Sequence, residues 1–301
     1  MKKYISFSLS LILFLVTLIT FFTLQGKYSQ KAYFGKEYAV IRVMEEDKIT
    51  PLEISGIRYA VEEASHTVEN GNGRLWCDAY SYFETAFVSR EDSKTLECQA
   101  VVTGGDYFLF HNLEFVNGYY YSDSDLNLDR VVIDEKLAFD LFGSNNAEGM
   151  TVILGDKTYY VAGVVSLEEN KAREIQLGDT PVIFIPQNIG ETLYGTRDYD
   201  VYEVMMQNDL PSYAFNTVSA VCEGKDVIDV THRFDLKNII KIIGQFPSRS
   251  FVTKNFSYPY YENADRGRED VLSILLVLNA VTFVIFAVNT TILIYKLRRK
   301  R

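Results

Sequence analysis

Residues that could bind a metal ion or catalyse a reaction are scattered along this sequence. One segment has a regular spacing, because acidic and amide side chains alternate at Asp123, Asp125, Asn127 and Asp129, with Asp134 at the twelfth position. The alternation is typical of the first ligands of a calcium-binding loop, but the sixth position is leucine instead of glycine and the twelfth is not glutamate. We therefore interpret the segment as a solvated acidic turn that precedes a strand.

Motifs for other kinds of catalysis are missing from the sequence. Its three histidines, His66, His111 and His232, are too far apart to suggest a zinc site, and no H-E-x-x-H occurs. There is no G-x-S-x-G or S-x-x-K segment for a nucleophilic serine, and no G-x-x-x-x-G-K-[S/T] loop for ATP. We therefore predict a chain that is not an enzyme and binds no metal or cofactor, with an anchored extracellular hydrolase as an alternative.

The most regular polar pattern lies inside the two most apolar segments. Residues 5–24 and 271–295 are uncharged runs of 20 and 25 residues, and a helix of about 20 residues spans the hydrocarbon core of a bilayer. One face of each predicted helix carries small or amide polar side chains: Ser6, Ser10, Thr17 and Thr20 in the first, and Asn279, Thr282 and Asn289 in the second. We predict that a face made of Ser10, Thr17, Asn279, Thr282 and Asn289 pairs helices in the membrane. For the first segment, the alternative is that the hydroxyls bond their own backbone.

The first apolar segment has a second interpretation as a cleaved secretory signal, because Lys2 and Lys3 precede it. An apolar run of 20 residues exceeds the roughly 7–15 residues typical of a signal, and no A-x-A cleavage site follows it. We therefore predict an uncleaved membrane anchor.

The charge is divided unevenly between the ends and the middle of the chain. The formal net charge of the chain is −10. The two lysines at the start and five cations among the last six residues contribute +7, whereas residues 25–270 hold 23 Lys and Arg against 40 Asp and Glu, a charge of −17. Positive segments stay in the cytoplasm. We therefore predict a two-pass protein of the cell membrane with both termini cytoplasmic and 246 residues outside. The negative middle excludes nucleic acid as a partner.

Periodicity in the middle of the chain predicts an α+β extracytoplasmic domain flanked by two transmembrane α-helices. Thr50 and Glu53 form a capping box that opens a helix running toward His66. We expect strands at 75–88, 95–103, 130–134, 181–185 and 201–207, a hairpin at 150–154 and 157–165, and helices at 135–142 and over most of 226–243. The domains are then 1–26 (cytoplasmic stub and first membrane helix), 27–267 (outer domain) and 268–301 (second membrane helix and basic tail).

Cysteines offer one covalent cross-link. Cys77 and Cys98 lie on two neighbouring predicted strands outside the membrane, where disulfides form. A bridge between them would contribute roughly 3 kcal/mol to stability. The alternative is two buried thiols, and Cys222 has no partner in either case.

Several segments together carry a resemblance to a known family. They are GGDYFLFHNLEFVNGYYYSDSD (104–125), RVVIDEKLAFDLFG (130–143), EGMTVILGDKTYYVAGVV (148–165), PVIFIPQ (181–187) and, leaving the second apolar run, VNTTILIYKLRRK (288–300). In their order and spacing, these segments resemble the extracytoplasmic core domain of MacB-type ABC transporter permeases, a group that includes FtsX-like and lipoprotein-releasing permeases.

The resemblance implies a membrane subunit of an ABC transporter or mechanotransmission complex, which relays ATPase-driven motion to its outer domain. Typical members have four membrane helices, whereas this sequence ends six residues after its second apolar run. We therefore expect the partners to be a separate ABC ATPase subunit, further permease-like helices from a second copy or another chain, and the lipid bilayer. The alternative function is a stand-alone, membrane-anchored binding or sensing module.

Overall fold

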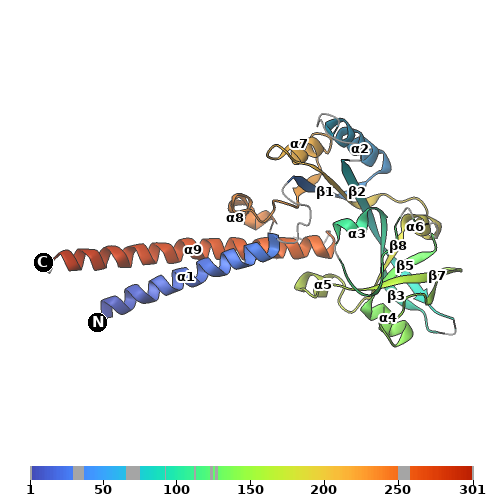
Figure 1. Ribbon diagram of the computed structural model, residues 1–301, viewed down its shortest axis with the longest axis horizontal. Helices are drawn as coiled ribbons and strands as arrows, with labels where there is room; N and C mark the ends of the chain where they lie inside the picture. The colour runs from blue at the N-terminus through green and yellow to red at the C-terminus, as the bar shows by residue number, and fades with distance from the viewer. Residues whose placement is uncertain are drawn as a thin grey trace. The chain divides into compact units, whose positions relative to one another are not determined.

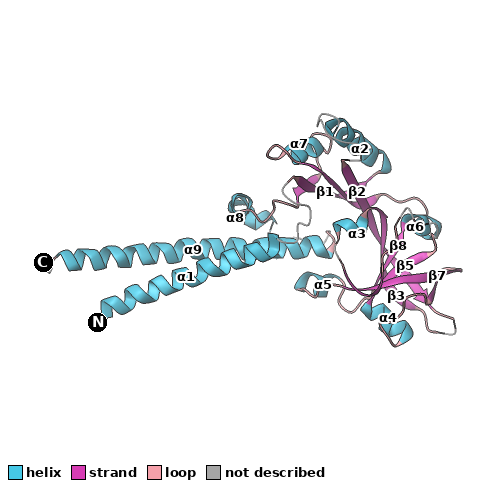
Figure 2. Ribbon diagram, in the orientation of Figure 1, coloured by secondary structure: helices cyan, strands magenta, loops and turns pink. Residues whose placement is uncertain are grey.

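The computed structural model describes residues 2–29, 37–65, 75–91, 93–111, 113–122, 125, 128–249 and 258–299 (Figure 1, Figure 2). The chain divides into two compact units. The first, which we call the helical unit, contains Met1–Tyr33, Thr231–Phe256 and Tyr261–Arg301, and the second, the sheet unit, contains Phe34–Val230 and Ser257–Tyr260. The described residues 231–249 and 261–267, which the sequence assigns to the outer domain, group with the terminal helices.

In the described residues, the sheet unit contains ten strands. They are β1 (Tyr38–Ile49), β2 (Trp76–Ser89), β3 (Leu96–Gly105), β4 (Glu114–Gly118), β5 (Arg130–Asp134), β6 (Thr151–Leu154), β7 (Lys157–Ser166), β8 (Val182–Pro186), β9 (Tyr199–Gln207) and β10 (Asp226–Asp229). Their order is β10-β1-β9-β2-β3-β8-β5-β7-β4, and β6 pairs with both β2 and β7. The pairs β3–β8 and β5–β7 are parallel and the other pairs are antiparallel. This mixed sheet confirms the α+β class.

The double pairing of β6 closes part of the sheet into a ring. Strand β2 is 14 residues long, so that one of its sides pairs with β3, while the other pairs with β9 at Trp76–Ser81 and with β6 at Val88 and Ser89. The pairings β2–β3–β8–β5–β7–β6 then return to β2. Closure of this kind removes exposed strand edges, which would otherwise pair with other chains.

Alternating side chains divide the interior of the sheet unit into two cores. Val131 and Ile133 of β5 face the larger core, whereas Val132 between them faces the smaller one. Val101 and Val102 of β3 divide in the same way. Short helices complete the unit: α2 (Pro51–Ser65), α3 (Tyr107–Phe110), α4 (Glu135–Phe142), α5 (Lys171–Gln176), α6 (Gln187–Tyr194) and α7 (Tyr213–Ser219).

Local signals in the sequence placed several of these elements correctly. The capping box is confirmed, because the Thr50 amide donates to Glu53 Oε2 at 2.8 Å and the Glu53 amide donates to Thr50 Oγ1 at 3.3 Å. A close backbone approach explains Gly163 on β7. A Cβ atom there would lie 2.5 Å from the Tyr119 carbonyl oxygen, and one on Gly118 would lie 2.2 Å from the Ala162 carbonyl oxygen. Only glycines let β4 and β7 come this close.

Two expectations are wrong. Residues 226–243 are not mostly helical, because Asp226–Asp229 form β10 on the edge of the sheet beside β1, and the helix begins at Leu236. The register also excludes the disulfide. Cys98 lies opposite Ala86 and Cys77 lies opposite Met205. The two cysteines are therefore nine positions apart along the β2–β3 ladder, about 30 Å, whereas a disulfide needs Cα atoms within about 7 Å.

Candidate functional site

The terminal helices of the helical unit carry the residues singled out by their polar spacing. Helix α1 (Lys2–Ser29) and helix α9 (Tyr260–Arg298) are both long and apolar enough to cross a membrane, with mean hydropathies of 2.5 and 2.7 over their most apolar windows. Most of their apolar side chains are exposed, including Leu9 and Ile19 of α1 and Val284 of α9. A helix in water would bury such a surface against protein, whereas a membrane helix presents it to lipid.

The polar faces of α1 and α9 meet each other. Thr17 Oγ1 lies 3.3 Å from Thr282 Oγ1, and Asn279 Nδ2 donates to the Thr17 carbonyl oxygen at 3.4 Å. Nearer the N-terminus of α1, Ser6 Oγ donates to Asn289 Oδ1 at 3.2 Å. Thr17, Asn279 and Thr282 are buried. These polar side chains therefore join the two helices of one chain. The surface of α1 and α9 that is available to further helices is mostly apolar.

Part of the polar face is used within a single helix. Ser10 is buried, and its hydroxyl donates to the Phe7 carbonyl oxygen of its own helix at 2.9 Å. The Thr17 and Thr282 hydroxyls also lie within hydrogen-bond distance of carbonyl oxygens one turn earlier. Such bonds satisfy a hydroxyl inside the membrane without a second helix. The polar contacts between α1 and α9 are therefore the Thr17–Thr282 contact and the hydrogen bonds of Asn279 and Asn289.

Aromatic rings fill the space between the polar contacts. Phe7 and Phe14 of α1 pack on Phe286 of α9, with ring centroids 5.6 and 6.1 Å apart, and Phe14 also packs on Phe283 at 5.5 Å. Pairs at these distances stabilise a contact by about 0.5–1.5 kcal/mol beyond burial alone. The face is thus a packed helix interface along its length.

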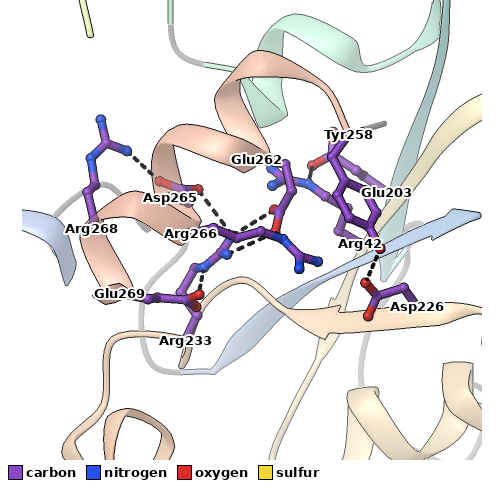
Figure 3. Close-up of polar contacts among 10 residues, drawn as sticks. All are labelled: Arg42, Glu203, Asp226, Arg233, Tyr258, Glu262, Asp265, Arg266, Arg268 and Glu269. Carbon is purple, nitrogen blue, oxygen red and sulfur yellow. Dashed lines mark hydrogen bonds and ion pairs between the residues drawn. The ribbon is translucent and has the colours of Figure 1, made fainter. Parts of the chain in front are cut away.

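Where α9 begins, it carries a buried cluster of charges (Figure 3). Arg233 binds both carboxylate oxygens of Glu262, at 2.9 and 3.0 Å, and its Nε donates to Glu269 Oε1 at 3.0 Å. Asp265 accepts from Arg233 at 3.2 Å, and Arg266 donates to Glu262 at 2.9 Å. Arg268 also pairs with Asp265. We call these six residues the Arg233 cluster, in which three guanidinium groups balance three carboxylates.

Burial makes the Arg233 cluster sensitive to the loss of any member. Arg233, Glu262 and Glu269 are at most 3% exposed. Burial by itself would lower the pKa of Arg233, but the charges of Glu262, Glu269 and Asp265 outweigh it and raise the pKa well above its ordinary value. Arg233 therefore stays charged. It holds the segment before α8 (Leu236–Arg249) against the first turns of α9.

The residues just before α9 are fixed within the sheet unit. Tyr258 donates its hydroxyl hydrogen to Asp226 Oδ2 at 2.8 Å, as Figure 3 shows, and its carbonyl oxygen accepts from Gln176 Nε2 at 2.7 Å. Tyr260 is the first residue of α9, and burial raises its pKa to about 12. Helix α9 therefore starts from a residue held by the sheet unit.

A second buried ion pair lies within the sheet unit. Arg42 of β1 stands directly opposite Glu203 of β9, and its Nε donates to Glu203 Oε1 at 2.8 Å. His111 Nε2 lies 2.6 Å from the other Glu203 oxygen, with its ring stacked on Tyr107. Burial would raise the pKa of Glu203, but His111 and Arg42 outweigh it and lower the pKa to about 2. This carboxylate stays ionised and joins α3 to the strands.

Other predicted or conceivable sites do not assemble. Asp123, Asn127 and His66 lie outside the described residues, and Asp134 caps α4 by accepting from the Leu137 amide at 2.8 Å. Among the described residues no group of three metal ligands occurs. A pocket of about 240 Å³ is smaller than typical ligand sites and is lined by Tyr121, Ser122, Leu128, Arg130, Pro186, Gln187, Asn188 and Glu191. This described lining holds no histidine, cysteine or lysine.

Sequence reasoning missed the Arg233 cluster, although one signal was present. Glu262, Asp265, Arg266 and Glu269 follow the spacing i, i+3, i+4 and i+7, which places them on one helix face just before an apolar run. In the sequence, these residues are visible only as part of the negative charge of residues 25–270. Arg233 is 29 residues from Glu262 in the chain, and no local pattern connects the two.

Residues 7–221 match the family model of the MacB-like periplasmic core domain. Two solved structures also align with the chain. One is the extracellular domain of the noncanonic ABC-type transporter YknZ from Gram-positive bacteria, with 18% identity, a TM-score of 0.44, and coverage of 64% of this chain and 99% of that one. The other is the periplasmic region of MacB from Actinobacillus actinomycetemcomitans, with 14% identity, a TM-score of 0.45, and coverage of 67% and 92%. No curated protein sequence matches the chain.

Proposed function

Because the chain belongs to the family defined by the MacB-like periplasmic core domain, we propose that it is a permease-like membrane subunit of an ABC-type transport or mechanotransmission complex. In this proposal it catalyses no reaction. A separate ABC ATPase drives the motion, further permease helices surround α1 and α9, and the sheet unit transmits the motion outside the cell membrane.

The observation that carries the proposal is the continuity of α9. It is one helix of 39 residues, and it includes both the carboxylates of the Arg233 cluster and the polar face that pairs with α1. Its first residue, Tyr260, comes two positions after Tyr258, whose hydroxyl and carbonyl groups are both hydrogen-bonded within the sheet unit. An unbroken helix about 58 Å long is stiff along its axis. A push or a tilt applied at its C-terminal end would therefore reach its first turn.

The orientation is part of the same proposal. The basic residues after the second apolar run favour a cytoplasmic C-terminus, and the acidic middle of the chain favours the opposite side. Two membrane passes then place the N-terminus in the cytoplasm as well. The polar contacts between α1 and α9 support a two-helix hairpin as the membrane part of the subunit.

Purification from native membranes tests the proposal. The tagged chain, produced at its native level and extracted in mild detergent, is expected to bring down an ABC ATPase that mass spectrometry identifies. The matched control replaces residues 271–295 with an unrelated membrane helix, which keeps the anchor and the sheet unit but removes the specific helix face. The ATPase should be lost from this control.

Recovery of the unaltered chain without any ATPase or permease-like protein would overturn the proposal and favour the stand-alone binding or sensing module. Equal recovery of the ATPase with the control would show that the apolar run does not provide the contact.

A further inference from the structure

Helix α8 belongs to the helical unit and has an apolar arc wider than the surface it buries. Ile239 and Ile242 are 0% and 6% exposed, because they pack against α1 and α9. Leu236 and Ile240 are 42% and 55% exposed. With 3.6 residues per turn, Leu236 and Ile240 lie one turn apart on the flank next to the buried strip. The apolar surface of α8 therefore continues past its protein contacts.

The position of α8 along the terminal helices shows what this flank faces. Its buried side packs in one cluster with Phe21, Leu24 and Tyr28 of α1 and with Leu272, Leu275 and Leu276 of α9. Those residues stand at the ends of the two uncharged runs, which stop at residue 24 and start at residue 271. Figure 1 shows α8 beside α1 and α9 at this level. A bilayer that covers both runs would therefore reach α8 at its interface.

Charge on α8 agrees with this placement. Lys237 and Lys241 are exposed and lie one turn apart. Around the circumference of α8, the buried strip is followed by the flank of Leu236 and Ile240, and that flank is followed by the two lysines. A helix that rests in the lipid interface has this pattern, with apolar side chains in the acyl region and cations at its border that reach the phosphates. Asp235 stands before the helix, and over residues 236–245 the charged side chains of α8 are these two lysines.

We infer that α8 lies in the surface of the membrane leaflet where the two apolar runs end, at residues 24 and 271, with Leu236 and Ile240 inserted among the acyl chains and Lys237 and Lys241 at the lipid phosphates. The chain then contacts the bilayer at a third place besides α1 and α9. Because the Arg233 cluster directly precedes α8, this contact would hold the charged start of α9 at a fixed depth. The inference requires no ATPase partner and goes beyond the proposed function.

Depth-resolved fluorescence quenching tests the inference on the full chain in lipid nanodiscs. The sequence has one tryptophan, Trp76, so a Trp76→Phe background makes each added tryptophan a single reporter. Ile240→Trp probes the flank, and Gln245→Trp, on the opposite side of α8, is the matched control. Val281→Trp, an exposed position within the apolar run of α9, marks the acyl region. The quenchers are lipids brominated near the glycerol or near the chain end, and aqueous iodide.

Ile240→Trp should be quenched about twofold or more by the shallow bromolipid, because interfacial helices insert by about 5–10 Å. Gln245→Trp should be quenched mainly by iodide, and Val281→Trp mainly by the deep bromolipid. Leu236→Trp repeats the test if the first variant does not fold.

Two results would overturn the inference. Quenching of Ile240→Trp by iodide as strong as that of Gln245→Trp would place the flank in water. Protection of Ile240→Trp from both bromolipids and iodide would show that a protein partner covers it.

Discussion

At the scale of single residues, buried charge has opposite consequences in the two units. The guanidinium of Arg233 is surrounded by carboxylates, so its charge is compensated on several sides. Asp134 of the sheet unit has a more distant cation, Arg173 Nη2 at 3.7 Å, and burial raises its pKa to about 6 in spite of the hydrogen bond from the Leu137 amide. The first group stabilises its unit at neutral pH, whereas the second costs stability there.

Asp134→Asn should stabilise the sheet unit at neutral pH. A carboxyl whose pKa is raised by folding contributes stability that is fully present below its unfolded pKa, near 4, and that is lost as the pH rises through about 6. Asparagine keeps the helix cap without the charge. We expect the variant to be more stable by about 2–3 kcal/mol at pH 7.5, with little difference at pH 4.

Urea unfolding of the full chain in detergent, followed by Trp76 fluorescence, measures this difference. Asp140→Asn, on the exposed side of α4, is the control and should change stability by less than about 0.5 kcal/mol. The prediction would be contradicted if Asp134→Asn changed the free energy of unfolding by the same amount at pH 4 and at pH 7.5.

Arg233→Met should destabilise the helical unit. The substitution leaves Glu262 and Glu269 buried without their shared cation, and breaking a buried pair from one side costs about 3–5 kcal/mol. Thermal unfolding or protease resistance in detergent should reveal the loss. Arg298→Met removes an exposed cation from the other end of α9 and should have almost no effect. Adding Glu269→Gln to Arg233→Met should recover part of the loss, because it removes the buried carboxylate that Arg233 Nε bound, and further destabilisation by this addition would contradict the account.

At the scale of elements, the pairing of α1 with α9 combines a few polar contacts with many apolar ones. Each polar contact between membrane helices is worth about 0.6–2 kcal/mol, and the phenylalanines that pack against each other add a similar amount per pair. The Thr17–Thr282 contact stands near the middle of the interface, between the Ser6–Asn289 contact and the Phe21–Leu272 cluster. It should therefore report the register of the two helices.

Cysteine cross-linking tests that register. In a background without the native cysteines, Thr17→Cys combined with Thr282→Cys should form a cross-link within one chain under mild oxidation, because the two side chains already touch. Ile12→Cys combined with Val281→Cys uses two exposed positions and should not form a cross-link within the chain. Equally fast cross-linking of both pairs would show that the helices do not hold one register.

At the scale of the whole molecule, the chain separates its charges between two ends and a middle. The cations after the second apolar run and the acidic excess between the runs favour opposite sides of a membrane. Residue accessibility in intact cells decides this arrangement. Leu52 of α2, which is 81% exposed, is a suitable reporter for the sheet unit.

A membrane-impermeant maleimide should label Leu52→Cys in intact cells, in a background without the native cysteines. A cysteine added after Arg301 should react only after the membrane is permeabilised, because the basic end is expected in the cytoplasm. Replacing the five terminal cations with glutamine should weaken this preference. Labelling of the added C-terminal cysteine in intact cells would contradict the predicted topology.

The sequence alone determined what depends on neighbours along the chain. The two apolar runs, the capping box at Thr50 and Glu53 and the β6–β7 hairpin follow from local spacing along the chain. Even the polar faces of the terminal helices could be identified before the structure, because helical periodicity places their members together.

The tertiary structure decided what depends on residues that are distant in the sequence. The edge strand β10 forms because β1 offers it a partner, and the register of β2 and β3 keeps Cys77 and Cys98 apart. The Arg233 cluster depends on a contact across 29 residues. That the polar face of α1 packs against the polar face of α9 is shown only by contacts such as Thr17–Thr282. Local propensity specifies an element, but only packing free energy selects which elements meet.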